Sequence, residues 1–134
     1  MQLRDGRQVD GASLRQARAG VPSDAFVLYL LGRRPRGDVS EGRRWVQWRD
    51  FGTPASTEDA LDALREAHRR AADGPVLIVC CGGVGRTGTA LAVLLLMEGA
   101  SVDEAVDRVR REHHPRAVET RGQRRWLHEV AARL

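Results

Sequence analysis

The chain has 134 residues, of which 42% are hydrophobic and 30% charged, a balance typical of a globular domain in water. Its longest apolar run, Ala90 to Met97, is too short to cross a bilayer, and its start lacks the charged-then-apolar pattern of a signal peptide. We therefore predict one domain over residues 1–134, monomeric and cytoplasmic, with no membrane partner.

The basic side chains are all arginine: the chain has 22 Arg and no Lys, and its formal net charge is +4. A basic balance suits an anionic partner, including nucleic acid. The arginines are interleaved with 18 acidic residues, however, and only short clusters such as Arg33–Arg34–Pro35–Arg36 stand out. Interleaved charge is typical of a solvated surface, so we predict no nucleic-acid partner.

The first third of the chain predicts strands. Leu3 to Val9 surrounds Asp5-Gly6, a dipeptide typical of hairpin turns. Phe26 to Leu31 is a continuous apolar run followed by Gly32, which predicts a buried strand. We expect a polar turn over residues 37–42 and a further short strand at Trp45–Trp48.

The next segments alternate helix and strand. Ser56 or Thr57 is placed to cap a helix that Gly74-Pro75 ends. The run Val76–Val79 is apolar and mostly β-branched, as in a strand buried within a parallel sheet. The segment Thr87–Met97 is apolar nearly all round, which predicts a buried central helix.

Two more helices are indicated by capping boxes. Ser101 with Glu104 begins one helix, which Pro115 ends, and Thr120 with Gln123 begins the other. Strands interspersed with helices predict an α/β fold with a central, partly parallel sheet flanked by helices.

The cysteines and histidines do not predict a metal site. Cys80 and Cys81 are adjacent, so a disulfide between them would close no useful loop, and two thiols alone do not complete a structural zinc site. His113 and His114 are neighbours, which cannot face one ion together on a helix. We expect reduced thiols, no metal and no cofactor.

The segment Val76 to Gly88, VLIVCCGGVGRTG, combines a nucleophile with an anion site. Loop amides and a helix N-terminus direct their N–H groups at one point. Arg86 is placed to hold two phosphate oxygens, and the positive surroundings favour the thiolate of Cys80. Thr87 is placed to donate its hydroxyl to the sulfur. The predicted phosphate-binding residues are Cys81, Gly82, Gly83, Val84, Gly85 and Arg86.

This segment resembles the signature loop of the cysteine-dependent protein-tyrosine and dual-specificity phosphatases, H-C-x-x-G-x-x-R-[ST]. Cys80, Gly83, Arg86 and Thr87 match, and Cys81 fits the spacing one residue short. Val79 stands where the family usually has a His that helps to tune the thiolate and brace the loop. The resemblance implies hydrolysis of phosphomonoesters through a phosphocysteine at Cys80.

An upstream segment resembles the W-P-D loop of the tyrosine phosphatases. It reads WRDFGTP, from Trp48 to Pro54, with Arg49 in place of the usual Pro. The resemblance implies that Asp50 protonates the leaving oxygen and then acts as base in hydrolysis of the phosphocysteine. Taken alone, Asp50 would be interpreted as a turn residue; the downstream Cys80 loop favours the catalytic interpretation.

A third segment, VETRGQRRWL from Val118 to Leu127, resembles the Gln-bearing loop that positions the hydrolytic water. Gln123 falls on one of the family's Gln positions, and Glu119 stands where a second Gln often lies. The capping box with Thr120 explains Gln123 equally well, so both interpretations stay open. The family's Tyr-bearing recognition loop is not visible, and we assign Tyr29 to core packing.

Three other kinds of function are alternatives to phosphoprotein hydrolysis. A phosphate-binding pseudophosphatase would keep Arg86 but usually loses the Cys or the Asp. A sulfur-transfer or arsenate-reducing enzyme would not need the Asp50 loop. Inositol-phosphate phosphatases often place Lys in the loop, whereas residues 81–85 carry no charge. We therefore expect a phosphorylated protein or peptide as substrate; the choice between phosphotyrosine and phosphoserine or phosphothreonine depends on pocket depth.

Overall fold

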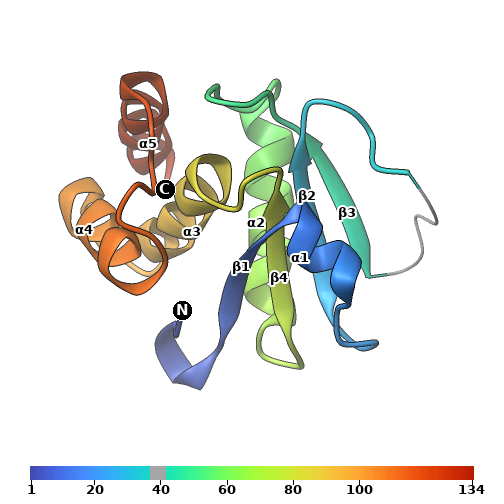
Figure 1. Cartoon of the computed structure of the whole chain (residues 1–134). Helices are drawn as coiled ribbons and strands as arrows, with labels where there is room; N and C mark the ends of the chain where they lie inside the picture. The colour runs from blue at the N-terminus through green and yellow to red at the C-terminus, as the bar shows by residue number, and fades with distance from the viewer. Residues whose placement is uncertain (37–41) are drawn as a thin grey trace.

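A four-stranded sheet forms the middle layer of the molecule (Figure 1). The computed structural model describes residues 1–36 and 42–134. The strands follow the order β1-β4-β2-β3, and each neighbouring pair is parallel. Their bounds are Val9–Ser13 for β1, Phe26–Leu31 for β2, Arg43–Gln47 for β3 and Val76–Cys80 for β4. The predicted α/β class is confirmed. The sheet was predicted to be partly parallel, and all its described strand pairs are parallel.

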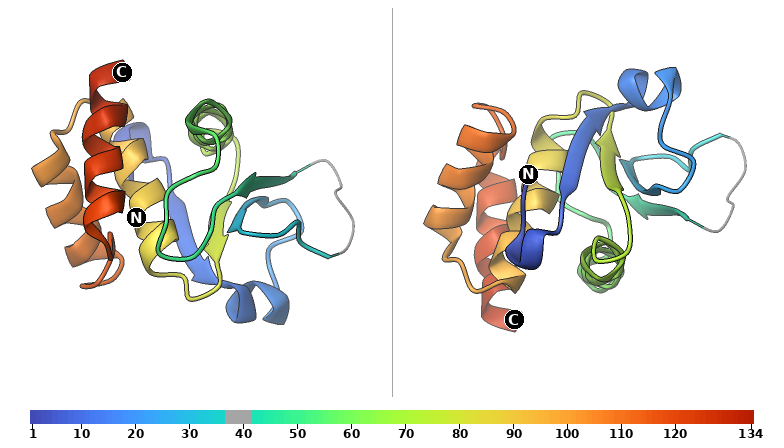
Figure 2. Two further views of the ribbon diagram at one scale, coloured as in Figure 1. Left: turned by 90° about the horizontal axis from the view of Figure 1, so that it is seen from above. Right: turned by 90° about the horizontal axis from the view of Figure 1, so that it is seen from below.

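Helices cover both faces of the sheet (Figure 2). Short α1 lies on one face, while α2 and α3 lie on the other and α4 and α5 pack beyond α3. The bounds are Leu14–Ala19 for α1, Thr57–Arg70 for α2, Gly85–Met97 for α3, Val102–Glu112 for α4 and Arg121–Arg133 for α5. Helix α3 is buried along nearly its whole length, because it contacts the sheet, α2, α4 and α5. This arrangement explains why its sequence is apolar on all sides.

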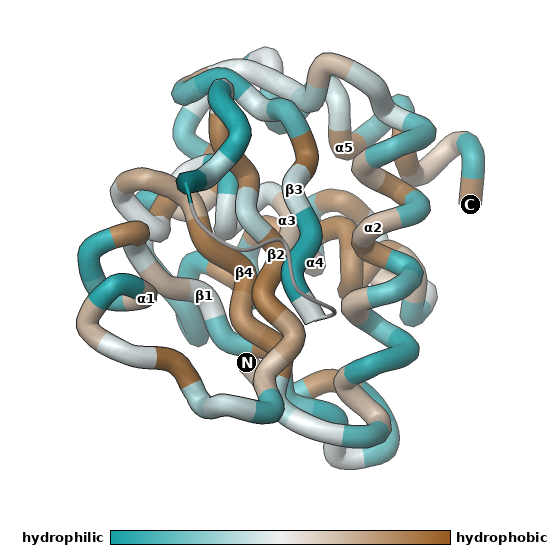
Figure 3. Tube along the Cα trace, turned by 90° about the vertical axis from the view of Figure 1, so that its right-hand side faces the viewer, coloured by the Kyte–Doolittle hydropathy of each residue, from teal (hydrophilic) through white to brown (hydrophobic). Residues whose placement is uncertain are grey.

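The two faces of the sheet bury unequal amounts of apolar surface. Along β2, Phe26, Leu28 and Leu30 belong to the main core shared with the large helices. Val27 and Tyr29 belong to a smaller cluster under α1, and Tyr29 stays only half-buried. The hydrophobic stretches of β2 and β4 run through the centre of the molecule (Figure 3). The six residues of α1 therefore cover their face only in part.

The prediction for the N-terminus was partly wrong. Asp5 and Gly6 have φ values of 60° and 74°, as a type I′ turn requires, and Gln2 pairs with Gln8 in the antiparallel sense. Residues Val9–Ser13, however, leave this hairpin and join β4 in parallel, and α1 follows. Neither β1 nor α1 was predicted, because only Val9 and Ala12 of the edge strand are buried and α1 has no buried residue.

Most other boundaries agree with the predictions. Ser56 caps α2, and the capping boxes of α4 and α5 form as expected. Strand β3 begins earlier than predicted, at Arg43, and its Arg44 pairs with Asp59 of α2 at 2.8 Å. The turn predicted at residues 37–42 lies outside the described residues except for Gly42. No helix within the described ranges is long and apolar enough to span a membrane.

Parallel pairing brings the carboxyl ends of the strands to one edge of the sheet, where ligand sites of open α/β folds lie. Strand β4 ends there at Cys80, and β3 leads there into the Asp50 segment. Strand β2 leads into Arg33–Arg36 and β1 into α1. The segments that follow the four strands therefore lie together at one edge of the sheet, although they are separated in the sequence.

Candidate active site

The Cys80 thiol lies at the carboxyl end of β4, and its side chain is 2% exposed. Its Sγ accepts a hydrogen bond from the Gly83 amide at 3.2 Å and one from the Thr87 hydroxyl at 3.0 Å. Two hydrogen-bond donors therefore face the sulfur. Thr87 itself is fully buried in the first turn of α3, so its hydroxyl is held toward the sulfur.

Gly83 allows the loop to bend where it passes the backbone of β1. Its φ is +70°, and a Cβ there would lie 2.6 Å from the backbone nitrogen of Ser13. Gly82, by contrast, has open space around the position of a Cβ. The tight curve that directs the Gly83 amide at Cys80 therefore depends on Gly83 in particular.

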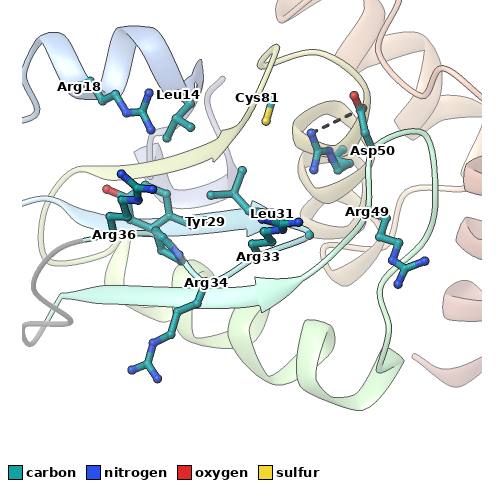
Figure 4. Close-up of a pocket in the computed structure, with 13 residues that line it drawn as sticks. Leu14, Arg18, Tyr29, Leu31, Arg33, Arg34, Arg36, Arg49, Asp50 and Cys81 are labelled. Atoms are coloured by element: carbon teal, nitrogen blue, oxygen red, sulfur yellow. Dashed lines mark ion pairs between the residues drawn. The ribbon is translucent and has the colours of Figure 1, made fainter.

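Arg86 is 3% exposed at the start of α3. Its Nη1 donates to the Trp48 carbonyl at 2.9 Å, and its Nη2 lies 3.5 Å from Oδ1 of Asp50 (Figure 4). Its Nε is buried and has no hydrogen-bond partner among the residues that the structure describes. Buried polar groups in proteins are nearly always paired, so a free Nε beside the loop amides indicates a site for an anion.

The Asp50 segment is closely bound to the rest of the site. The Trp48 indole donates to the Gly52 carbonyl at 2.7 Å, and the ring packs edge-on against Trp126 of α5. Asp50 remains 57% exposed and faces Arg86. The next residue, Phe51, is 59% exposed and has a positive φ of 61°, an uncommon backbone geometry for a bulky side chain. The carboxylate is thereby held at the mouth of the site.

Gln123 lies beneath the Asp50 segment. It is fully buried, and its Oε1 accepts hydrogen bonds from the Glu119 and Thr120 amides at 2.9 and 3.3 Å. Its Nε2 donates to the Gly52 carbonyl at 3.1 Å. The capping interpretation is therefore confirmed, and the same amide joins α5 to the Asp50 segment. Gln123 does not line the pocket around Cys80, so its role in positioning water stays a prediction.

Glu119 is the second carboxylate beside the nucleophile. It lines a pocket of about 230 Å³ together with Cys80 and Asp50, and it sits directly against Gly85 at the start of α3. Val118 before it has a φ of 61°, a strained value for a β-branched residue. Arg110 holds this backbone by donating to the Val118 carbonyl at 3.0 Å. The loop after α4 is thus shaped to present Glu119 to the site.

His113 braces the phosphate loop, a role that its sequence context does not predict. Its Nε2 lies 2.6 Å from the Gly83 carbonyl, and its ring fills the space beside Gly11 that a side chain there would need. Burial lowers the pKa of His113, although its hydrogen bond to Gly83 acts in the opposite direction. No local pattern marks this residue, because its partner lies 30 positions away.

Thus the structure gathers Cys80, Thr87, Arg86 and Asp50 into one site. Cys81 is exposed and lines a neighbouring pocket instead of the one around Cys80. Within residues 1–36 and 42–134, no three His, Cys, Asp or Glu side chains gather in a way that could hold a metal ion.

Comparison with known proteins shows the family to which the chain belongs. A model described as protein-tyrosine phosphatase matches residues 27–133. The chain belongs to the protein-tyrosine phosphatase family. The solved active form of Tk-PTP is 35% identical, with a TM-score of 0.68, over 83% of this chain and 80% of that one. PTPN18 in complex with HER2-pY1196 phosphopeptides is 28% identical, with a TM-score of 0.54, over 68% and 34% of the two chains.

The curated relatives described here are much longer than this chain. Tyrosine-protein phosphatase non-receptor type 18 of Mus musculus is 32% identical over 101 residues, which are 68% of this chain and 22% of that protein. Tyrosine-protein phosphatase Lar of Drosophila melanogaster is 26% identical over 97 residues, 66% of this chain and 5% of that protein. The chain therefore spans less than a quarter of either relative.

Gly83→Ala should destabilise the fold by more than about 2 kcal/mol, because the new Cβ meets the β1 backbone and φ is positive. Gly82→Ala is the matched control, since open space surrounds that position. Urea unfolding of both variants measures the difference. Equal stabilities would contradict the close approach of Gly83 to β1.

Lowering the pH should reduce stability partly through His113. Its pKa is lower in the folded chain than the ordinary 6.5, so the unfolded chain binds the proton first as the pH falls. The free energy of unfolding should thus decrease as the pH drops below about 6.5, and less so in His113→Gln. Urea titrations at pH 7.5 and 5.5 test this, with exposed His128→Gln as control. Identical pH dependence in wild type and His113→Gln would refute it.

Proposed function

We propose that this chain is a phosphatase that hydrolyses phosphomonoesters of phosphorylated proteins or peptides through a phosphocysteine. The observation that carries the proposal is the environment of Cys80. Two hydrogen-bond donors face its sulfur, and the buried guanidinium of Arg86 has an unpaired Nε among the described residues. A nucleophile and an anion site in one loop suit phosphoryl transfer, where catalysis consists mainly of positioning and charge stabilisation.

In the proposed first step, the Cys80 thiolate attacks phosphorus, and a P–S bond forms as the P–O bond to the leaving group breaks. Arg86 and the loop amides hold the equatorial oxygens. Asp50, in its protonated form, gives its proton to the departing oxygen. The phosphate displaces Asp50 from its 3.5 Å contact with Arg86 and brings the leaving oxygen toward the same carboxyl group.

In the second step, water attacks the phosphocysteine, and the P–S bond breaks to release inorganic phosphate. Asp50, now a carboxylate, accepts the proton of the water. The Thr87 hydroxyl, 3.0 Å from Sγ, stabilises the departing thiolate. Glu119 lies in the same pocket, and Gln123 supports the Asp50 segment from below.

A phosphorylated peptide is the substrate class that the comparisons favour, because PTPN18, a structural relative at 28% identity, is solved with phosphopeptides. The proposal includes one phosphatase domain over residues 1–134, acting as a cytoplasmic monomer without metal or nucleic acid. Peptides carrying phosphotyrosine, phosphoserine or phosphothreonine in the same sequence distinguish the preferred residue.

Cys80→Ser should lower the rate of hydrolysis of an aryl phosphate by about 10⁴-fold or more, because the alcohol is a far weaker nucleophile than the thiolate. Cys81→Ser should retain most of the activity, since the exposed Cys81 thiol does not face the Cys80 pocket. Assays in the presence of a chelator measure both rates. Loss of activity in Cys81→Ser alone would refute Cys80 as the nucleophile, and an inactive wild type that binds vanadate would favour a phosphate-binding module.

Asp50→Asn should lower kcat by about 10²–10³-fold on substrates with poor leaving groups, because an amide cannot supply the proton. The loss should shrink as the leaving group becomes a better one. A series of aryl phosphates of graded phenol acidity measures this trend, with Asp62→Asn on the exposed face of α2 as control. A loss independent of the leaving group would indicate that Asp50 only supports the loop.

A further inference from the structure

A second pocket of about 570 Å³ opens beside the phosphate loop and is continuous with it through Cys81 and Arg86 (Figure 4). Segments that follow all four strands line it. Helix α1 contributes Arg18, and the segment after β2 contributes Arg33 and Arg36. Its position at the shared edge of the sheet places it next to the scissile phosphate of the proposed reaction.

The pocket is strongly cationic. Of the thirteen described residues that line it, six are arginines and one, Asp50, is a carboxylate that already faces Arg86. Arg18, Arg33 and Arg36 are exposed, and no carboxylate of the described residues forms an ion pair with them. In Figure 4, Arg34 and Arg49 extend away from the centre of the pocket, whereas Arg18, Arg33 and Arg36 lie around it.

Several arginines elsewhere on the described surface form ion pairs with nearby acids, whereas Arg18, Arg33 and Arg36 form none with a described carboxylate. Arg44 contacts three carboxylates of α2, and Arg124 pairs with Asp103 at 2.6 Å. Arg108 pairs with Glu112 along α4. Among the described lining residues, positive charge therefore exceeds negative charge, which suits an anionic ligand.

The inner wall of the pocket is apolar. Leu14, Leu31 and the half-buried Tyr29 line it beneath the arginines. A ligand with charge on every side, such as an inositol polyphosphate, would leave this wall without a partner. A peptide has an uncharged body and separate negative groups, so it matches both the wall and the arginines.

We propose that this pocket binds a second anionic group of the phosphopeptide substrate, an inference that rests on the proposed function. Acidic side chains or a second phosphate beside the scissile phosphoresidue bind to Arg18, Arg33 and Arg36. Their fork-shaped donors suit carboxylate and phosphate oxygens equally. The arginines thus select phosphorylated sites in acidic surroundings, while Cys80, Arg86 and Asp50 act on the scissile phosphate of any accepted site.

The test compares kcat/KM for three peptides that share one scissile phosphoresidue and differ in their flanks: neutral, Glu-rich, and with a second phosphate. Wild type should prefer the two acidic peptides by about tenfold, and the preference should fall as salt rises from about 0.05 to 0.5 M. The combined variant Arg18→Gln, Arg33→Gln and Arg36→Gln should lose it. Hydrolysis of a small aryl phosphate should be unchanged, because it is too short to reach Arg18, Arg33 or Arg36.

A charge-matched control removes three exposed arginines outside the pocket, as Arg15→Gln, Arg65→Gln and Arg125→Gln. This control should keep the preference, because Arg15 shares α1 with Arg18 but does not line the pocket. An equal loss in both triple variants would show a general effect of net charge and overturn the proposal. Equal kcat/KM for all three peptides in wild type, or faster hydrolysis of inositol hexakisphosphate than of any peptide, would also overturn it.

Failure of the proposed function has a different signature, namely no hydrolysis of the aryl phosphate by wild type. Peptide binding to the Cys80→Ser variant decides the role of the pocket even in that case. Tighter binding of the acidic peptides, lost on adding the three pocket substitutions, supports the proposal. Equal dissociation constants for neutral and acidic peptides reject it.

Discussion

The candidate site depends on the parallel pairing of all three strand pairs in the described sheet. Parallel strands end at the same edge, so the segments that follow them meet there whatever their separation in sequence. Cys80, the Asp50 segment, the Arg33–Arg36 segment and α1 come together for this reason. An antiparallel sheet of the same strands would send half of these segments to the opposite edge.

Close packing then shapes the loop between β4 and α3. Gly83 passes against the backbone of β1, and the His113 ring holds the Gly83 carbonyl from the other side. Within this frame the Gly83 amide and the Thr87 hydroxyl are directed at Cys80. His113, the residue after the last one of α4, supplies this brace, and the residue before Cys80 is the apolar Val79.

Strained backbone is concentrated around the same site. Phe51 and Val118 both have a φ of 61°, and their segments are linked by the hydrogen bond from the Thr120 hydroxyl to the Phe51 carbonyl. Such conformations persist only where surrounding contacts stabilise them. Here Gln123 and Arg110 provide those contacts, with hydrogen bonds to the Gly52 and Val118 carbonyls. The two carboxylates beside Cys80 are therefore held by backbone that the rest of the fold keeps in place.

The sequence by itself determined those features that depend on residues close along the chain. The Cys80 to Thr87 loop, the buried helix after it and the capping boxes of Ser101 and Thr120 were predictable, because each follows from local spacing and hydrophobic pattern. Tertiary structure alone decided the parallel pairing of β1, the His113 brace and the placing of Gln123 under Gly52. It also brought Arg18 beside Arg33 and Arg36. These features join segments from different strand ends and helices, and no local pattern encodes which distant segment lies opposite.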